Sequence, residues 1–535
     1  MKRLSALYIA LLVALVLSSY GIGCSTPVSS PIPTPTPSII RIPASPIPQD
    51  EFYANISEGM MFIRNTAFPA GYQNPLAHTV IPQNQYMAPN GKSNMHCDTY
   101  MTDTYNVSGP LGRNTSVIST YRGFAECATV TFDSKGRIIT TCTNLSGPIL
   151  LLLDPLTLDE LASYTLPQRS EDWENDPITP LEDTSGGAYF YIDNQDRAVI
   201  GTNNKSIQII QFNESRCVFQ LVREYDLRDY VVVKQPPARD KVGTILPDWN
   251  GLLWYVTRYG MVGTVNAESG EVHTIELKGE EIENSFAVAE DGVYIVSDYA
   301  LYRFHSGADG TPVVDWRTAY DRGTQRKPGQ INQGSGTTPN VFGAMVAIGD
   351  NAEPRMNMLY LNRSTGKLVC KVPVFGKDAS CTENAPIGFA REGAKGLEYP
   401  LIVENNYGYQ SFFSTYIGES TVGGITRVDA VPDGKGGYTG KVIWTSSEVS
   451  PTTVPKLSLA NGLIYIYTKD ARSDGIDAWY FTALDFETGK TVFKILTGTG
   501  AGYNNHYAPI TISPQGGTAY IGCLNGLICI RDGAQ

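Results

Sequence analysis

The sequence predicts an all-β protein, a β-propeller of eight four-stranded blades. Three observations predict it. One pattern of strands and turns returns at intervals of 42 to 69 residues along the 535-residue chain. In the clearest copies, Asn-Gly or Thr-Gly turns join apolar runs, which is typical of β-hairpins. The composition agrees, because 31 tyrosines and 52 glycines accompany only 18% charged residues, a balance that favours strands over helices.

The repeat itself is clearest between Pro455 and Phe493. Apolar runs stand on both sides of Asn461-Gly462, and a third run leads to a turn at Thr488-Gly489 before a fourth. Four strands at this period are typical of a propeller blade. The leading strands begin near Ala128, Ala188, Thr244, Phe286, Asn340, Pro386, Pro455 and Pro509. If the weak copy at Ala188 or Thr244 is not a blade, the ring has seven.

The last repeat ends without a fourth strand. We expect residues 115–121, just before the first full repeat, to supply it and to close the ring by joining the two ends of the propeller. Residues 115–535 then form the propeller, and residues 49–114 form an N-terminal extension over one face. A polar cluster, His96-Cys97-Asp98 with Asp103, lies in this extension. It is either an ordinary polar loop or the rim of a pocket.

The N-terminus reads as a targeting segment. Lys2 and Arg3 precede an apolar run at 4–17 that is too short for a transmembrane span. The sequence Gly21-Ile22-Gly23-Cys24 resembles a bacterial lipoprotein signal, with Gly21 where leucine is usual. We therefore expect export and lipidation at Cys24, which places the protein on the periplasmic or extracellular face of the membrane; ordinary cleavage nearby is the alternative. Residues 1–24 are the signal, and the Pro/Ser/Thr-rich residues 25–48 are an extended stalk.

The repeat resembles the pyrroloquinoline-quinone-type propeller superfamily. The resemblance rests on the run from Ala483 to Phe493 and on the run from Gly516 to Ile530, and it covers most of residues 120–532 at the level of fold. In the quinoprotein enzymes the first motif ends in a tryptophan that locks neighbouring blades. Here that position is Phe493 or Cys370, with Trp444 the one close match. Because most repeats lack this tryptophan, the resemblance implies the quinone as a cofactor less strongly. The superfamily also contains non-catalytic scaffolds, so the fold alone does not decide the function.

Net charge and cysteine spacing limit the class of partner and the redox compartment. A net charge of −12 argues against nucleic acid as a partner and gives no reason to expect binding to an anionic membrane surface. The expected partner is a small ligand or an envelope protein. Cys127 and Cys142 stand symmetrically about the turn at Ser134-Lys135, so they would be opposed in a hairpin. A disulfide between them suits an oxidising compartment, and buried free thiols are the alternative.

Polar residues recur where the first strand of a repeat begins and its second strand ends. These two positions share one face of a propeller because the strands are an antiparallel pair. Carboxylates and amides from most blades would therefore meet there, and such oxygens are ligands for calcium. The predicted metal-ligating residues are Glu126, Glu283, Asn284, Asp350, Asn351, Glu383, Asn384, Glu404, Asn405 and Asn505. The competing interpretation is that Asn and Asp stand at strand ends because they form turns.

Two classes of function follow. The polar face looks like that of calcium-dependent propeller hydrolases, in which His506 would serve as the base, and quinoprotein oxidoreductases also hold calcium beside the quinone. The alternative is a non-catalytic scaffold that binds another envelope protein. The sequence identifies no substrate.

Overall fold

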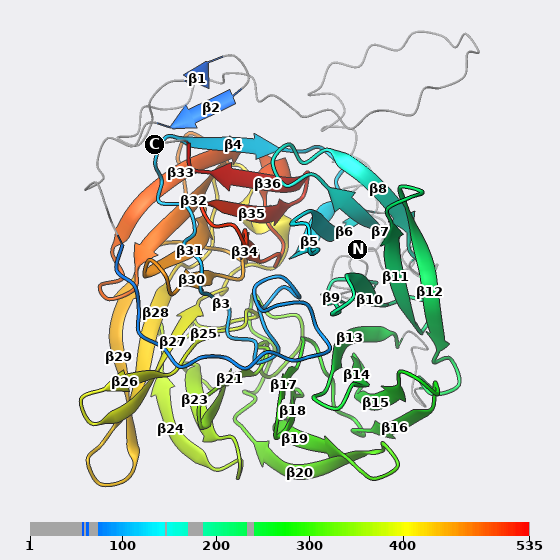
Figure 1. Cartoon of the computed structure of the whole chain (residues 1–535). Coiled ribbons are helices and arrows are strands. Elements are labelled where there is room, and N and C mark those ends of the chain that lie inside the picture. The colour runs from blue at the N-terminus through cyan, green and yellow to red at the C-terminus, as the bar shows by residue number, and fades with distance from the viewer. Residues whose placement is uncertain are drawn as a thin grey trace, which may run out of the picture.

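The computed structural model describes residues 56–57, 60–63, 73–144, 147–168, 186–232 and 240–533. Within these ranges the chain is strand and turn, with two short 3₁₀ helices, η2 (Phe412–Thr415) and η3 (Ala501–Tyr503). The strands form eight sheets arranged in a ring (Figure 1), and we call the interior of this ring the channel. The prediction of an all-β propeller is confirmed, and the described ring has eight blades rather than seven.

Each blade takes its strands in chain order from the channel outward. Blades 1 to 4 are β5 (Glu126–Phe132), β6 (Ile138–Asn144), β7 (Gly147–Leu153), β8 (Glu160–Thr165); β9 (Tyr191–Ile192), β10 (Arg197–Gly201), β11 (Ser206–Asn213), β12 (Val218–Asp226); β13 (Val242–Pro247), β14 (Leu252–Thr257), β15 (Met261–Asn266), β16 (Val272–Glu276); and β17 (Ala287–Ala289), β18 (Gly292–Val296), β19 (Ala300–Ser306), β20 (Pro312–Ala319).

Blades 5 to 8 follow the same order, except that the outer strand of blade 8 comes from the N-terminal side. They are β21 (Asn340–Phe342), β22 (Met345–Gly349), β23 (Asn357–Asn362), β24 (Leu368–Pro373); β25 (Ile387–Gly388), β27 (Gly396–Glu404), β28 (Ile425–Pro432), β29 (Tyr438–Ser446); β30 (Lys456–Ser458), β31 (Leu463–Thr468), β32 (Ala478–Asp485), β33 (Thr491–Thr499); and β34 (Ile510–Ile512), β35 (Thr518–Cys523), β36 (Gly526–Arg531), β4 (Thr115–Ser119). A short strand, β26 (Arg391–Gly393), pairs with the start of β27.

The ring is closed by β4, which pairs antiparallel with β36 so that Ser119 faces Ile528 and Ser116 faces Arg531. This confirms the predicted closure by an N-terminal strand. Two further strands, β2 (Met60–Ile63) and β1 (Ile56–Ser57), add to the outside of β4. The two ends of the propeller are therefore joined within one sheet, that of blade 8.

The core lies between the blades. Inner strands are buried throughout, whereas outer strands such as β8, β24 and β29 expose much of their length. Aromatic side chains fill the gaps between sheets; for example, the rings of Trp254 on β14 and Phe304 on β19 are 6.3 Å apart. Burial of this kind supplies the main stabilisation of the fold.

Aromatic side chains on outer strands also lock blades in pairs. Trp444 of blade 6 donates its indole N–H to the Phe486 carbonyl in blade 7 at 2.9 Å, and its ring covers Gly489. Trp316 of blade 4 covers Gly366 of blade 5 in the same way. Both glycines have positive φ, +68° and +69°, and a Cβ at either would collide with the indole. Sequence reasoning found Trp444 and missed Trp316.

The N-terminal extension closes one end of the channel. Its residues 84–108 run around the inside of the ring where the inner strands end (Figure 1). Seven blades donate backbone N–H groups to its carbonyls at 2.7–3.1 Å, and Asn84 donates to the Pro247 carbonyl of the remaining blade 3. The donors are Phe132, Ile192, Val288, Val341, Gly388, Leu457, Leu459 and Gly517. We call residues 84–108 the plug.

Candidate functional site

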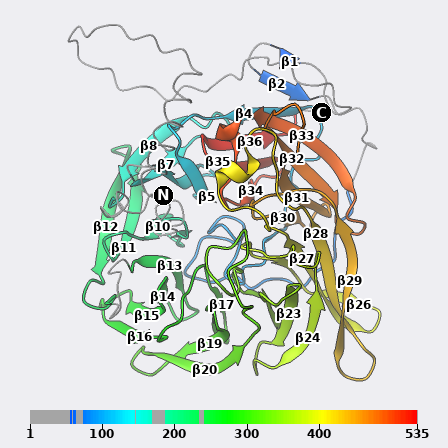
Figure 2. The ribbon, with the colours of Figure 1, turned by 180° about the vertical axis from the view of Figure 1, so that it is seen from behind.

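The residues predicted to form a polar ring stand at the other end of the channel, where the inner strands begin. Figure 2 shows the ribbon from that side. Glu283-Asn284 precede β17, Glu383-Asn384 precede β25, and Glu404 is the last residue of β27. The antiparallel pairing of β25 with β27 places Glu404 beside Glu383-Asn384, as the connectivity argument predicts. Helix η2 crosses this end of the ring in Figure 2.

We call Glu383, Asn384 and Glu404 the axial cluster: Asn384 is hydrogen-bonded to Glu404, and Glu383 precedes Asn384 in the chain. All three are buried. The Asn384 amide donates to Glu404 Oε1 at 3.0 Å, and the amide of Asn406 donates to the same oxygen at 3.0 Å. Both oxygens of Glu383, Oε2 of Glu404 and Oδ1 of Asn384 are buried without a hydrogen-bond partner among the described residues. The backbone of Ile331 approaches Glu383 and Ser450 approaches Glu404, but neither contact has hydrogen-bond geometry.

Burial controls the electrostatics of this cluster. It raises the pKa of Glu383 well above the usual value for a glutamate, and the neighbouring charge of Glu283 raises it further. Burial likewise raises the pKa of Glu404 well above its usual range. Glu283 is compensated by Arg258, whose Nη2 lies 3.2 Å from Oε2. Because an uncompensated buried carboxylate is costly, Glu383 and Glu404 must either hold protons or hold a cation.

Loops from other blades cover the cluster. A Cβ at Gly336 would lie 2.5 Å from the Glu383 carboxyl carbon, so only glycine permits this approach. Asn284 donates to the Gly336 carbonyl and accepts from the Tyr189 hydroxyl at 2.7 Å. The Tyr507 hydroxyl donates to the carbonyl of Gly329 at 3.2 Å. The site is thus assembled from blades 2, 4, 5, 6 and 8.

Four other predicted ligands hold loops. Asp350 accepts the backbone N–H of Asn357 at 2.6 Å and its side-chain amide at 2.8 Å. Asn351 donates to two carbonyls of the 321–325 loop, at 3.0 and 3.1 Å. Asn405 and Asn505 likewise donate their amides to backbone carbonyls. Their hydrogen bonds are those of turn-forming residues at strand ends.

Glu126 and His506 form a separate pair. Glu126 Oε1 accepts the backbone N–H of His506 at 2.8 Å. Burial raises the pKa of Glu126 to about 8, and the His506 hydrogen bond opposes that shift. The His506 ring lies between Tyr409 and Tyr507, and its Nδ1 is 3.2 Å from the Tyr409 hydroxyl. Its role as a base stays a prediction.

Next to Glu126, the structure joins Cys127 and Cys142 in a disulfide between β5 and β6. The two residues face each other in the register, at the position the symmetric spacing gave them. Cys24 lies outside the described residues.

Some residues of the site were missed by sequence reasoning. Tyr189 and Tyr507 contribute rings and hydroxyls around the axial cluster, and Arg258 neutralises Glu283. Tyr507 directly follows Asn505 and His506, which were predicted as site residues. Its position in the sequence could therefore have indicated that it lies at the site. Arg258 follows the second strand of blade 3, a position where only oxygen ligands were sought.

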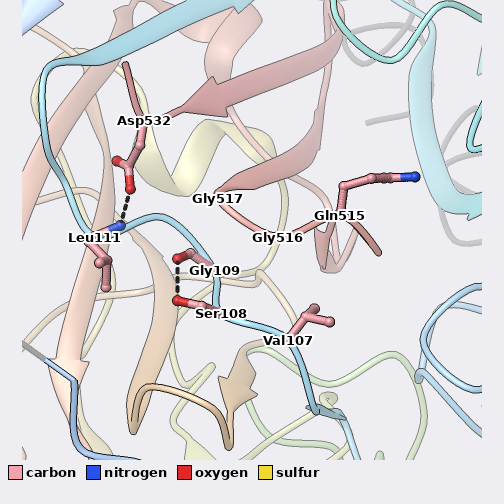
Figure 3. A pocket seen from close by; sticks show the side chains of 8 residues that line it. All are labelled: Val107, Ser108, Gly109, Leu111, Gln515, Gly516, Gly517 and Asp532. Atoms are coloured by element: carbon pink, nitrogen blue, oxygen red, sulfur yellow. Dashed lines mark hydrogen bonds between the residues drawn. The ribbon is translucent and has the colours of Figure 1, made fainter. Parts of the chain in front are cut away.

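A shallow pocket of about 500 Å³ lies at the plug end (Figure 3). It is lined by Val107–Gly109, Leu111, the turn 515–517 and Asp532. The Asp532 carboxylate accepts the N–H groups of Leu111 and Arg113 at 2.6 and 3.0 Å. Its charged group is therefore used to hold the extension against blade 8.

Neither a protein-only metal centre nor a membrane span is found in the part of the chain that the structure describes. No three His, Cys, Asp or Glu side chains there are grouped to hold a metal, so a cation at the axial cluster would need amide oxygen and water beside two carboxylates. No helix in the same part of the chain has the length and hydropathy to cross a membrane.

Comparison with known proteins does not show a family for this chain. No family model matches the chain. An uncharacterized protein of Archaeoglobus fulgidus is 26% identical over 319 residues, 53% of this chain and 60% of that relative. The match therefore spans about three fifths of the length of that relative.

Among solved structures, quinohemoprotein alcohol dehydrogenase from Comamonas testosteroni is similar at 11% identity and a TM-score of 0.49, covering 84% of this chain and 82% of that one. BamB from Moraxella catarrhalis is similar at 12% identity and a TM-score of 0.36, covering 63% and 94%. A computationally designed protein, Ika8, is similar at 11% identity and a TM-score of 0.41, covering 77% of this chain and 97% of that one. The expected resemblance to the pyrroloquinoline-quinone-type superfamily is confirmed at the level of the eight-bladed fold; scores this low say nothing about ligand or activity.

Proposed function

We propose that this protein binds one hard divalent cation, calcium, on the propeller axis, with Glu383, Glu404 and Asn384 as its ligands. The observation that supports the proposal is the set of four buried acceptor oxygens without donors in these three side chains. Calcium takes six to eight oxygens from carboxylates, amides and water. Two carboxylates would balance its double charge, which removes the need to bury two protonated acids.

The same residues do not fit a quinone. Pyrroloquinoline quinone carries three carboxylates and would face Glu283, Glu383 and Glu404. The cation nearest to them, Arg258, is already paired with Glu283. We therefore derive no chemistry through the quinone.

We propose that the ion is structural. Glu383 is 6% exposed, and Gly336 packs directly on its carboxyl group. A hydrolase needs its substrate to reach the metal, whereas a structural ion is best enclosed. In this position the ion joins loops from five blades at the end of the channel that the plug does not reach.

Calorimetric titration with calcium tests the proposal. The full-length protein is stripped with a chelator and titrated beside two variants, Glu383→Gln and Asp350→Asn. We expect one equivalent bound by the native chain and by Asp350→Asn, whose carboxylate holds a loop, and none by Glu383→Gln. Equal binding by all three would show that Glu383 is no ligand.

We also propose that the chain is exported and lipid-anchored through Cys24. The disulfide between Cys127 and Cys142 supports an oxidising compartment. Metabolic labelling with a radioactive fatty acid tests the anchor: the native chain should be labelled, and Cys24→Ser should not. Equal labelling of both would place the lipid elsewhere.

A second candidate function is a scaffold for another envelope protein. The observation that favours it is exposed apolar surface on the neighbouring outer strands β8 and β12, where Leu161, Leu221 and Val222 are 44%, 41% and 51% exposed. A photoreactive residue at position 222 should give one discrete adduct in cells, and the same residue at 435 in an exposed turn should not. Adducts from both positions, or from neither, would speak against this surface.

A further inference from the structure

A buried lysine and a buried aspartate meet where the plug joins blade 7. The plug strand β3 (Thr104–Tyr105) pairs in parallel with β30, with Thr104 opposite Leu457. One step earlier in this register, Asp103 lies beside Lys456, and the Leu457 N–H donates to the Asp103 carbonyl at 3.1 Å. Lys456 Nζ contacts Asp103 Oδ1, and both side chains are 0% exposed. The fold therefore fixes an amine against a carboxyl group away from water.

The surroundings supply a proton carrier. His96 Nδ1 is 3.1 Å from both carboxylate oxygens of Asp103 and is itself buried. The carboxyl group of Asp98 is also buried, and burial raises its pKa to about 7. The backbone is unusual here, because Cys97, Met101 and Asp103 all have positive φ, at +75°, +60° and +56°. Left-handed backbone at three non-glycine residues in one segment is typical of a functional site.

A second buried pair in the same blade provides a contrast. Lys469 Nζ lies 3.2 Å from Asp477 Oδ1, and it also donates to the Glu419 carbonyl. The Asp477 carboxylate accepts two backbone N–H groups, from Ile417 and Gly418, at 3.1 and 2.8 Å. Each group of this pair therefore has backbone partners besides the other. The Asp103 carboxyl group, in contrast, is contacted by the side chains of His96 and Lys456, so an amine and a proton carrier meet at one carboxyl group.

We propose that Lys456 and Asp103 form an intramolecular isopeptide bond. In the neutral pair, Nζ of Lys456 attacks Cγ of Asp103, so that a C–N bond forms. His96 returns the amine proton to the departing oxygen, the C–O bond breaks, and one water leaves. The products are an amide and water, so no oxidant or reductant is needed. Fixed proximity drives such a step, since held reactants behave as if at very high concentration.

The bond would tie the plug covalently to the inner strand of blade 7. Tension on the segments that precede the plug would then pass into the ring instead of pulling the plug from the channel. This inference does not depend on the axial cation, because none of its residues belongs to the axial cluster.

Peptide mapping of the full-length protein tests the bond. The chain is denatured with reductant, alkylated and digested with trypsin. Without the bond, trypsin cleaves after Lys456 and releases Ser93–Arg113, Val442–Lys456 and Leu457–Lys469 separately. With the bond, Lys456 resists cleavage, and Ser93–Arg113 is found joined to Val442–Lys469 at the summed mass less about 18 Da, one water. Full recovery of the three separate peptides would overturn the proposal.

Three variants assign the chemistry. Lys456→Arg keeps a cation but cannot form the amide, so the joined peptide should disappear. Asp103→Asn can form the same amide by releasing ammonia, so the joined peptide should persist. His96→Gln should lower the joined fraction at least several-fold. The internal control is the Asp477 peptide, Ser473–Lys490, which should keep its unmodified mass in every sample. A joined peptide in Lys456→Arg would contradict the assignment.

Discussion

The two ends of the channel solve the same problem in different ways. At the end where the inner strands finish, the plug takes backbone N–H groups from seven blades, and a side chain reaches the eighth. At the end where they begin, loops from five blades surround Glu383, Glu404 and Asn384, and four oxygens of these side chains have no donor among the described residues. The first end is held by hydrogen bonds that the chain makes with itself. The second, in our proposal, is completed by the cation.

Removing the plug should have the largest effect. Deletion of residues 84–108 exposes the edges of the inner strands and leaves their N–H groups unpaired inside a channel. We expect the variant to lose cooperative thermal unfolding or to be recovered only as aggregate. Shortening the stalk at 25–48 is the control and should leave the melting curve unchanged. A folded plug-free ring would show that the blades close by themselves.

Calcium removal should have the next largest effect. A ligand that binds only the folded state stabilises it by about 2.7 kcal/mol at a hundredfold excess over Kd. We therefore expect chelation to lower the melting temperature of the native chain, and calcium to restore it. The same chelation should leave the melting temperature of Glu404→Gln unchanged, because this variant already lacks one of the proposed ligands. A shift of equal size in both proteins would place the stabilising ion elsewhere.

Substitutions without calcium sharpen the distinction between the axial cluster and the turn residues. In the metal-free chain Glu383 carries a raised pKa, so Glu383→Gln replaces one neutral group with another and should cost under about 1 kcal/mol. Asp350→Asn disturbs three hydrogen bonds and should cost about 1–3 kcal/mol. Denaturant unfolding measures both. The reverse order of costs would mean that Glu383 is an ordinary packed acid.

The smallest effect should be a pH dependence from Glu126. Its pKa is raised from 4.5 to about 8 in the folded chain, so the folded state keeps a proton that the unfolded state releases. This contribution to stability is present below pH 4.5 and is lost as the pH rises toward 8. Unfolding at several pH values should show the decline, and Glu126→Gln should flatten it. A native chain that gains stability across this range would contradict the assigned shift.

The sequence predicts much of the fold because the strands and turns of each repeat follow one another directly in the chain. Alternating apolar runs and turns such as Asn461-Gly462 mark each hairpin, and the missing strand of the last repeat points to β4. Connectivity also predicts which face carries Glu383 and Glu404. Both follow from strand order without knowledge of tertiary contacts.

Sequence reasoning could not separate Glu383 from Asp350. Both are acidic residues at strand ends, and the difference lies in what other blades bring to them. Asp350 meets the N–H of Asn357, whereas Glu383 meets Gly336 and no donor. An N-terminal extension over one face was predicted, but the pairing of the plug with the blades was not, because the plug follows no repeat and its pairing partners are spread over the whole ring.

The most direct test of the axial cation is to locate it. Crystals of the native chain grown with calcium, measured for anomalous scattering, should show one peak between Glu383 and Glu404, with carboxylate and Asn384 oxygens at about 2.3–2.6 Å. The account would be contradicted by an ordered axial cluster without such a peak, its carboxyl groups hydrogen-bonded to water or to each other.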